Sequence, residues 1–145
     1  NLGNRRVLIK NLGIAHTKGD LIAYDFNTNT YITGDVIFIG RAAAFSDANI
    51  PMWINVINNK LDLSWDYLIP GHGSIINNKL ELNDTKNWLY FLDNAAKQAV
   101  SEGDMISEIF QYPIPKEIHH LKMKSITLRQ GIKKQLDLYR KKYIE

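Results

Sequence analysis

Apolar residues in this chain follow strand-like spacing up to about residue 70 and helix-like spacing from about residue 82, so the fold must combine a sheet with helices. Short runs rich in β-branched and aromatic residues, bounded by turn residues, are typical of strands. Such runs occur at residues 5–10, 20–26, 30–33, 36–39 and 66–69. The turn Asn27–Asn29 joins two of them as a hairpin. The chain is therefore predicted to belong to the α/β (α+β) class.

Helical spacing is found in four segments. Pro51 stands at the start of a helix predicted over 51–60, a position that favours proline. The other predicted helices cover 82–102, 104–111 and 121–143. Strands come first and helices last, with no repeat and no boundary between them. The chain is predicted to be one domain over 1–145, strand-rich in 1–79 and helical in 80–145.

Composition and charge exclude several kinds of site and partner. Cysteine is absent from the 145 residues, so a metal site must use His, Asp or Glu. The net charge is +3, and residues 116–145 alone hold nine Lys or Arg against three Asp or Glu. Such a basic helix suits an anionic surface or simply a solvated face. The basic residues lack interleaved aromatics, so no nucleic acid is expected, and no apolar run is long enough to span a membrane.

Two short motifs place chemically active side chains at strand ends. The segment His16–Asp20 (His-Thr-Lys-Gly-Asp) lies where the first strands meet a loop, and Gly19 would let the backbone pass close to a bulky group. Asp35 follows a Thr-Gly pair between two apolar runs, so we expect it to be buried. A buried carboxylate needs a cation or backbone N–H groups, which leaves a metal ligand and a turn residue as alternatives.

A third motif, Pro70–Gly73 (Pro-Gly-His-Gly), predicts a tight turn at the end of a strand. The turn would fix His72, and neutral imidazole is the commonest metal ligand among side chains. The alternative is a turn that merely contains a histidine. His16, Asp35 and His72 are separated by 19 and 37 residues, and the ordered set is more specific than any one motif.

The ordered series resembles the C-terminal motifs of the metallo-β-lactamase superfamily. These motifs are His-Thr-x-Gly-Asp, Thr-Gly-Asp and Pro-Gly-His-Gly, found here at His16–Asp20, Thr33–Asp35 and Pro70–Gly73. The stretch Asp35–Arg41 and the helix around Trp53 are similar to the segments between these motifs. The resemblance covers about residues 7–76.

The resemblance implies a single partial domain, the C-terminal half of an αββα sandwich, with one mostly antiparallel sheet, helices on one face and a helical C-terminal tail. It implies that His16 binds the first of two zinc ions, Asp35 bridges both, and His72 binds the second; iron or manganese are other candidates. Hydroxide on the metal pair would attack an ester, thioester, lactam or similar bond of a small-molecule substrate. Thr17 and Asp20 would orient ligand imidazoles, unless Asp20 only caps the strand end.

The superfamily's N-terminal motif, His-x-His-x-Asp-His, is absent, and the adjacent His119 and His120 would not share a helix face. The isolated chain is therefore expected to bind metal poorly or not at all and to be inactive. An exposed sheet face would need the missing N-terminal half or a second copy of the chain to cover it. The chain is thus predicted to be part of a hydrolase. The alternatives are a non-catalytic dimerising or interaction module and a di-iron redox relative.

The residues after 80 resemble, less specifically, the zinc metallohydrolases of quinoprotein relay systems. The similar segments are Ser107–Ile109, Pro113–Pro115 and Tyr143–Glu145. This subfamily implies a bacterial periplasmic location; without it, a cytoplasmic location is expected.

Overall fold

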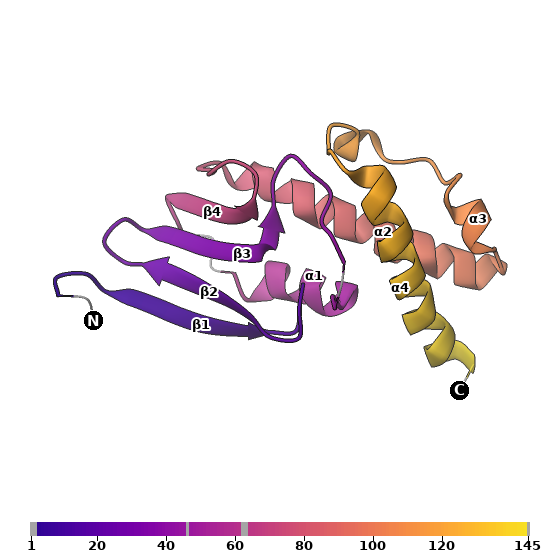
Figure 1. Cartoon of the computed structure of the whole chain (residues 1–145), viewed down its shortest axis with the longest axis horizontal. Helices are drawn as coiled ribbons and strands as arrows, with labels where there is room; N and C mark the ends of the chain where they lie inside the picture. The colour runs from indigo at the N-terminus through magenta and orange to yellow at the C-terminus, as the bar shows by residue number, and fades with distance from the viewer. Residues whose placement is uncertain (1–2, 46, 62–63, 145) are drawn as a thin grey trace.

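A four-stranded sheet forms the first part of the molecule, and helices lie behind it and beyond one of its ends (Figure 1). The computed structural model describes residues 3–45, 47–61 and 64–144, and only the backbone of 142–144. The strands are β1 (Val7–Gly13), β2 (Asp20–Asp25), β3 (Thr30–Phe38) and β4 (Tyr67–His72). The main helices are α1 (Ile50–Asn59), α2 (Asn83–Glu102), α3 (Ile106–Ile109) and α4 (Lys124–Ile144), with short 3-10 helices at Lys79–Leu82 and Lys116–Ile118.

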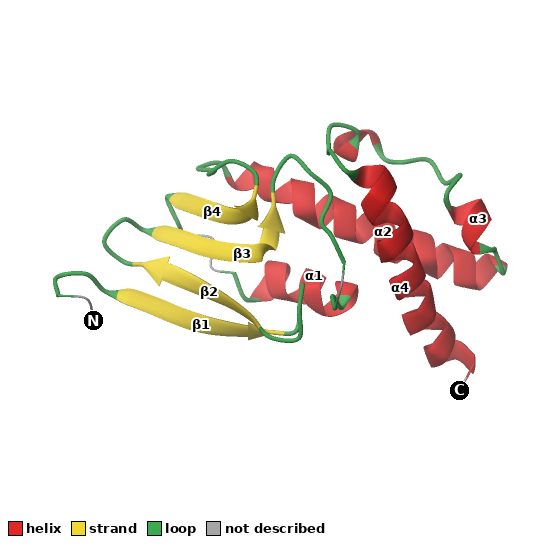
Figure 2. Cartoon of the chain, in the orientation of Figure 1, coloured by secondary structure: helices red, strands yellow, loops and turns green. Residues whose placement is uncertain are grey.

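The strands lie in the sheet in the order of the chain, β1-β2-β3-β4 (Figure 2). β1 pairs with β2 and β2 with β3 in antiparallel fashion, whereas β3 and β4 are parallel. Parallel neighbours need a crossover connection, and the segment carrying α1 supplies it. The prediction of a mostly antiparallel sheet with helices on one face and a helical tail is confirmed.

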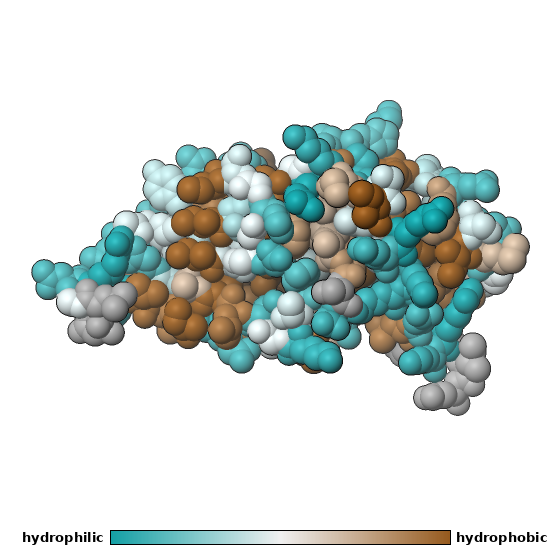
Figure 3. Space-filling view, in the orientation of Figure 1, coloured by the Kyte–Doolittle hydropathy of each residue, from teal (hydrophilic) through white to brown (hydrophobic). Residues whose placement is uncertain are grey.

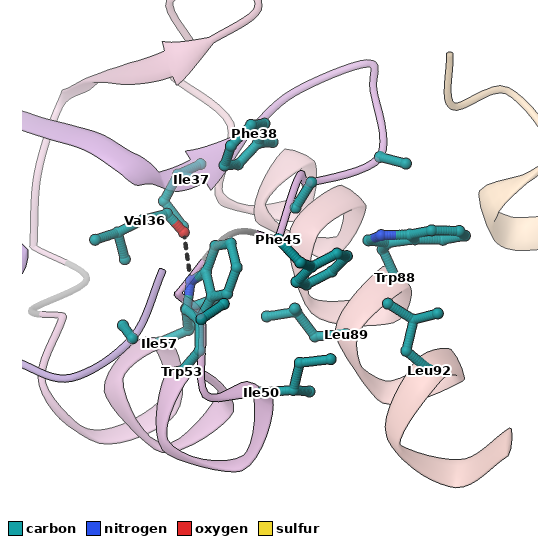
Figure 4. Close-up of a cluster of buried hydrophobic side chains, with 14 of the residues drawn as sticks. Val36, Ile37, Phe38, Phe45, Ile50, Trp53, Ile57, Trp88, Leu89 and Leu92 are labelled. Carbon is teal, nitrogen blue, oxygen red and sulfur yellow. Dashed lines mark hydrogen bonds between the residues drawn. The ribbon is translucent and has the colours of Figure 1, made fainter. Parts of the chain in front are cut away.

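The core lies between one sheet face and the helices. Trp53 of α1 is fully buried, and its indole N–H donates to the carbonyl of Val36, 2.9 Å away. Figure 4 shows Phe45 between Trp53 and the α2 side chain Trp88. A large aromatic ring contributes much buried apolar surface, and the hydrogen bond removes the cost of burying the indole N–H. Trp53 therefore fixes α1 against β3.

Helix α4 packs on α2 through a polar contact inside an apolar interface. Asp93 of α2 is buried and accepts hydrogen bonds from Lys97, from the amide of Gln135 and from the hydroxyl of Tyr139. Burial and the bond to Asp93 raise the pKa of Tyr139 above its ordinary value, which keeps the phenol a donor. Gly131 permits this approach, because a Cβ there would lie 2.6 Å from a methyl group of Leu92.

Several boundaries differ from those expected. The two apolar runs around Asp35 form one strand, β3, because Gly34 takes up the irregular register with a φ of +51°. β4 continues through Pro70, which lies on an edge strand where proline is tolerated. The helix expected over 104–111 is reduced to α3, since Glu108 caps the N–H of Met105 and Pro113 disfavours helix before it. Glu145 lies outside the described residues.

The second face of the sheet is open and apolar. Ile9, Ala23, Ile32 and Ile69 lie opposite one another across the four strands. Ile9 and Ile32 are 61% and 44% exposed. Figure 3 shows hydrophobic side chains gathered over the strands. In the part of the chain that the structure describes, no helix is long and apolar enough to span a membrane.

Candidate metal centre

The three predicted ligands come together at one end of the sheet. His16 lies in the loop between β1 and β2, Asp35 in the second half of β3, and His72 at the end of β4. β2 runs antiparallel to β3, and β4 runs parallel to it. The start of β2 and the ends of β3 and β4 therefore lie at the same end of the sheet. Strand pairing, together with the loop that carries His16, thus gathers residues that are far apart in the sequence.

Asp35 lies between the two imidazoles. One of its oxygens, Oδ2, is 3.9 Å from Nδ1 of His16, and the other, Oδ1, is 3.6 Å from Nε2 of His72. Two atoms that coordinate one tetrahedral zinc at about 2.1 Å lie about 3.4 Å apart. The observed separations are close to this value and too long for direct hydrogen bonds. Each carboxylate oxygen therefore faces a different imidazole, as a bridging carboxylate requires.

The burial of the three side chains is unequal. His16 is buried, and its Nδ1 has no hydrogen-bond partner in the described part of the chain. Leaving such an atom unsatisfied costs about 1–3 kcal/mol, so the atom favours a cation at this place. The side chains of Asp35 and His72 are 41% and 43% exposed. The expectation that Asp35 is buried was wrong, because its side chain lies at the end of the sheet and is partly open to solvent.

Gly71 is required by the approach of β4 to β3. A Cβ at this position would lie 2.1 Å from Oδ1 of Asp35 and 2.6 Å from the backbone of both Gly34 and Asp35. Gly73 has a φ of +102° and also lies against the carbonyl of Ile39. Gly71 and Gly73 therefore let the backbone on both sides of His72 lie directly against the backbone of β3 and of Ile39, which follows it.

Two buried aromatic rings surround the histidines. Phe38 lies 4.9 Å from the ring of His72, nearly parallel to it, and 5.7 Å from that of His16. Trp53 meets His16 edge-on at 5.2 Å. The sequence analysis singled out the helix around Trp53 but not Phe38. The signal available in the sequence was an aromatic residue in the apolar run that follows Asp35, three positions after it.

Solved structures with the same arrangement of elements are known. The sec-alkylsulfatase Pisa1 from a Pseudomonas species superposes on 94% of this chain with a TM-score of 0.74 at 17% identity, and the match covers 25% of that enzyme. The metallo-β-lactamase of Pontibacter korlensis matches 62% of this chain with a TM-score of 0.51 at 18% identity, over 44% of its own length. The DIM-1 metallo-β-lactamase matches 61% with a TM-score of 0.51 at 20% identity, over 45% of its length. This chain has the metallo-β-lactamase fold.

The chain spans less than half the length of these metallo-β-lactamases. Neither a protein-family model nor a curated protein sequence matches it significantly. The resemblance to the metallohydrolases of quinoprotein relay systems is not tested by these matches and stays a prediction.

Thr17 and Asp20 lie beside His16 in the metallo-β-lactamase fold of this chain. Both carboxylate oxygens of Asp20 accept hydrogen bonds from Thr17, one from its backbone N–H and one from its hydroxyl, each at 2.9 Å. These bonds close the loop that presents His16. Gly19 in the same loop was expected to allow a close approach, yet a Cβ there would meet nothing within 4 Å.

The remaining histidines have separate partners. His119 lies 2.8 Å from the carbonyl of Ile114, and His120 lies 2.8 Å from Oδ1 of Asp84. Residues 3–45, 47–61 and 64–144 contain no group of three or more His, Asp or Glu side chains that could by itself hold a metal ion. Asp35 thus faces His16 with one oxygen and His72 with the other, without a third such side chain beside either pair in the described residues.

Proposed function

We propose that this chain is part of a metal-dependent hydrolase of the metallo-β-lactamase superfamily, with His16, Asp35 and His72 as metal ligands. The observation that carries the proposal is the position of Asp35, whose two oxygens face two different imidazoles. The unsatisfied Nδ1 of His16 supports it. The metallo-β-lactamase fold supports the class of reaction.

Each residue of the proposed site would have a different role in binding the metal ions and the substrate. Two divalent ions, zinc in the proposal, would lower the pKa of a bound water toward about 7 and polarise the bond to be cleaved. Asp35 would tether both ions and offset part of their charge. His16, enclosed by aromatic rings, would provide a ligand that is shielded from water. His72 is half-exposed and would leave its side of the site accessible to a small-molecule substrate with an ester, thioester, lactam or similar bond.

The described residues hold an incomplete ligand set, so we propose that a second sheet supplies the rest. We propose that this second sheet packs on the open face formed by Ile9, Ala23, Ile32 and Ile69. Two sheets commonly bury their apolar faces against each other in this way, about 10 Å apart. The metallo-β-lactamases matched here extend over more than twice the matched length. The chain by itself is accordingly expected to bind metal weakly and to be inactive.

Zinc titration of the chain tests the ligand assignment. We expect measurable zinc binding that weakens more than about tenfold in His72→Ala and in Asp35→Asn, since each change removes a ligand. His119→Ala is the matched control and is expected to bind zinc like the parent, because the imidazole of His119 lies against the carbonyl of Ile114 and away from the candidate ligands. Calorimetry or competition with a chromogenic chelator would measure the affinities. Equal affinities for the parent chain and His72→Ala would overturn the assignment.

A second candidate function is a non-catalytic interaction module, in which a second copy of the chain covers the open face. The exposed apolar row on the sheet favours it, because patches of this kind mark interaction sites. A di-iron redox relative has no specific observation in its favour.

The open face predicts self-association of the chain when no second sheet is present. Ile32→Lys should shift the molecule toward monomer, because a charge at the centre of the row must be desolvated on association. Leu80→Lys is the control: Leu80 is 71% exposed and lies in the 3-10 helix before α2, off the sheet. Sedimentation velocity over a range of concentrations would measure both. A parent chain that stays monomeric and binds no apolar dye would contradict the prediction.

A further inference from the structure

Phe38 contacts both candidate ligand histidines from one buried position. Its ring is fully buried, and its centroid lies 5.7 Å from that of His16 and 4.9 Å from that of His72. We propose that Phe38 is a positioning residue that sets the orientation of the two imidazoles relative to Asp35. The inference rests on the proposed metal site and adds a residue that acts through the ligands rather than on the metal.

The orientation of His72 depends on Phe38 more than on its own neighbours in the chain. His72 lies between two glycines, which offer no side chain to restrict its rotation. Phe38 is its register partner in the parallel pair of β3 and β4, and the N–H of Ile39 donates to the carbonyl of His72 at 2.8 Å. The backbone is thus fixed, and the nearly parallel Phe38 ring, tilted by 26°, provides the wall against which the imidazole lies.

Phe38 is also one of the two aromatic rings that contact His16. His16 is held between Phe38 at 55° and Trp53 at 66°, and Trp53 is fixed by its hydrogen bond to Val36. Aromatic pairs in such tilted and offset arrangements are stabilised beyond the contribution of the area they bury. The Phe38 ring therefore restricts the orientation of two imidazoles, His16 and His72, that lie on different segments of the chain.

The consequence concerns metal affinity rather than folding alone. Without the ring, His72 would sample other rotamers, and binding would have to order it again. Phe38→Leu keeps an apolar side chain of similar volume but removes the flat wall. We expect it to weaken zinc binding about fivefold, within the range that one aromatic contact contributes.

The matched control is Phe45→Leu. Phe45 is also a buried ring and meets Trp53 at 6.0 Å, but its described ring contacts include neither histidine. Figure 4 shows Phe45 beside Trp53, on the side that faces α2. The two substitutions should destabilise the fold by similar amounts and differ in their effects on the histidines.

Proton NMR of the metal-free chain, followed by zinc titration, tests the proposal. In the parent chain the ring protons of His72 should be shifted upfield by the Phe38 ring current and show cross-relaxation with Phe38. Phe38→Leu should remove the upfield shift and weaken zinc binding, whereas Phe45→Leu should do neither. Absence of cross-relaxation between the two rings in the parent chain would overturn the proposal without any variant. So would unchanged His72 shifts in a folded Phe38→Leu, or equal loss of affinity in both variants.

The metal-free spectra also separate this inference from the proposed function. A parent chain that shows the shifted His72 protons but takes up no zinc would count against the metal site alone. The positioning of His72 by Phe38 would then stand as a property of the fold.

Discussion

Replacing Gly71 by alanine is expected to destabilise the fold by about 3 kcal/mol and to remove most zinc binding. The added Cβ would meet the backbone of Gly34 and Asp35 at 2.6 Å, and a rotamer change cannot relieve a clash with backbone. β4 would have to move away from β3 and take His72 with it. Urea denaturation would measure the loss of stability, and zinc titration would measure the loss of affinity.

Gly19→Ala is the control for this prediction, because Gly19 also lies in a ligand motif but has open space around it. It is expected to leave both stability and zinc affinity nearly unchanged. If Gly71→Ala matched the parent in denaturation midpoint, the close approach of β4 to β3 at this point would be wrong.

Asp93→Ala is expected to lower the free energy of unfolding by about 3 kcal/mol. Asp93 receives hydrogen bonds from Gln135 and Tyr139, both buried on α4. Removing the carboxylate leaves these two donors buried without an acceptor, at about 1–3 kcal/mol for each group. Denaturation followed by circular dichroism would detect the loss, since α2 and α4 supply much of the helical signal.

Lys97→Ala provides the control for the same network. Lys97 pairs with Asp93 at 2.7 Å, but its side chain is 53% exposed, and such ion pairs contribute about 0–1 kcal/mol. Asp93 would keep its two buried partners. Equal destabilisation by Lys97→Ala and Asp93→Ala would show that the buried donors are not the important part of the network.

The hairpin of β2 and β3 and the three candidate ligands could be predicted from the sequence because their signals are local. Turn residues Asn27–Asn29 fix the hairpin, and a glycine precedes both Asp35 and His72. Whether these three side chains hold metal stays a prediction.

Contacts between distant segments could not be predicted in this way. Phe38 reaches His72 only through the parallel register of β3 and β4, which no local pattern specifies. Asp93 reads in the sequence as an ordinary polar position on a helix, and only the packing of α4 shows that it is buried. The partial exposure of Asp35 likewise depends on how the distant segments pack, although the sequence places it between two apolar runs.

The sheet has two ends with different roles. His16, Asp35 and His72 occupy one end, and the hairpin turn of β2 and β3 lies at the other. Insertions or substitutions at the turn end should accumulate over evolution without displacing a candidate ligand, because the candidate ligands lie at the opposite end of the paired strands. Loops at the end that holds the candidate ligands should tolerate fewer changes. Sequence divergence among descendants of this chain should therefore decrease along each strand from the turn end toward that end.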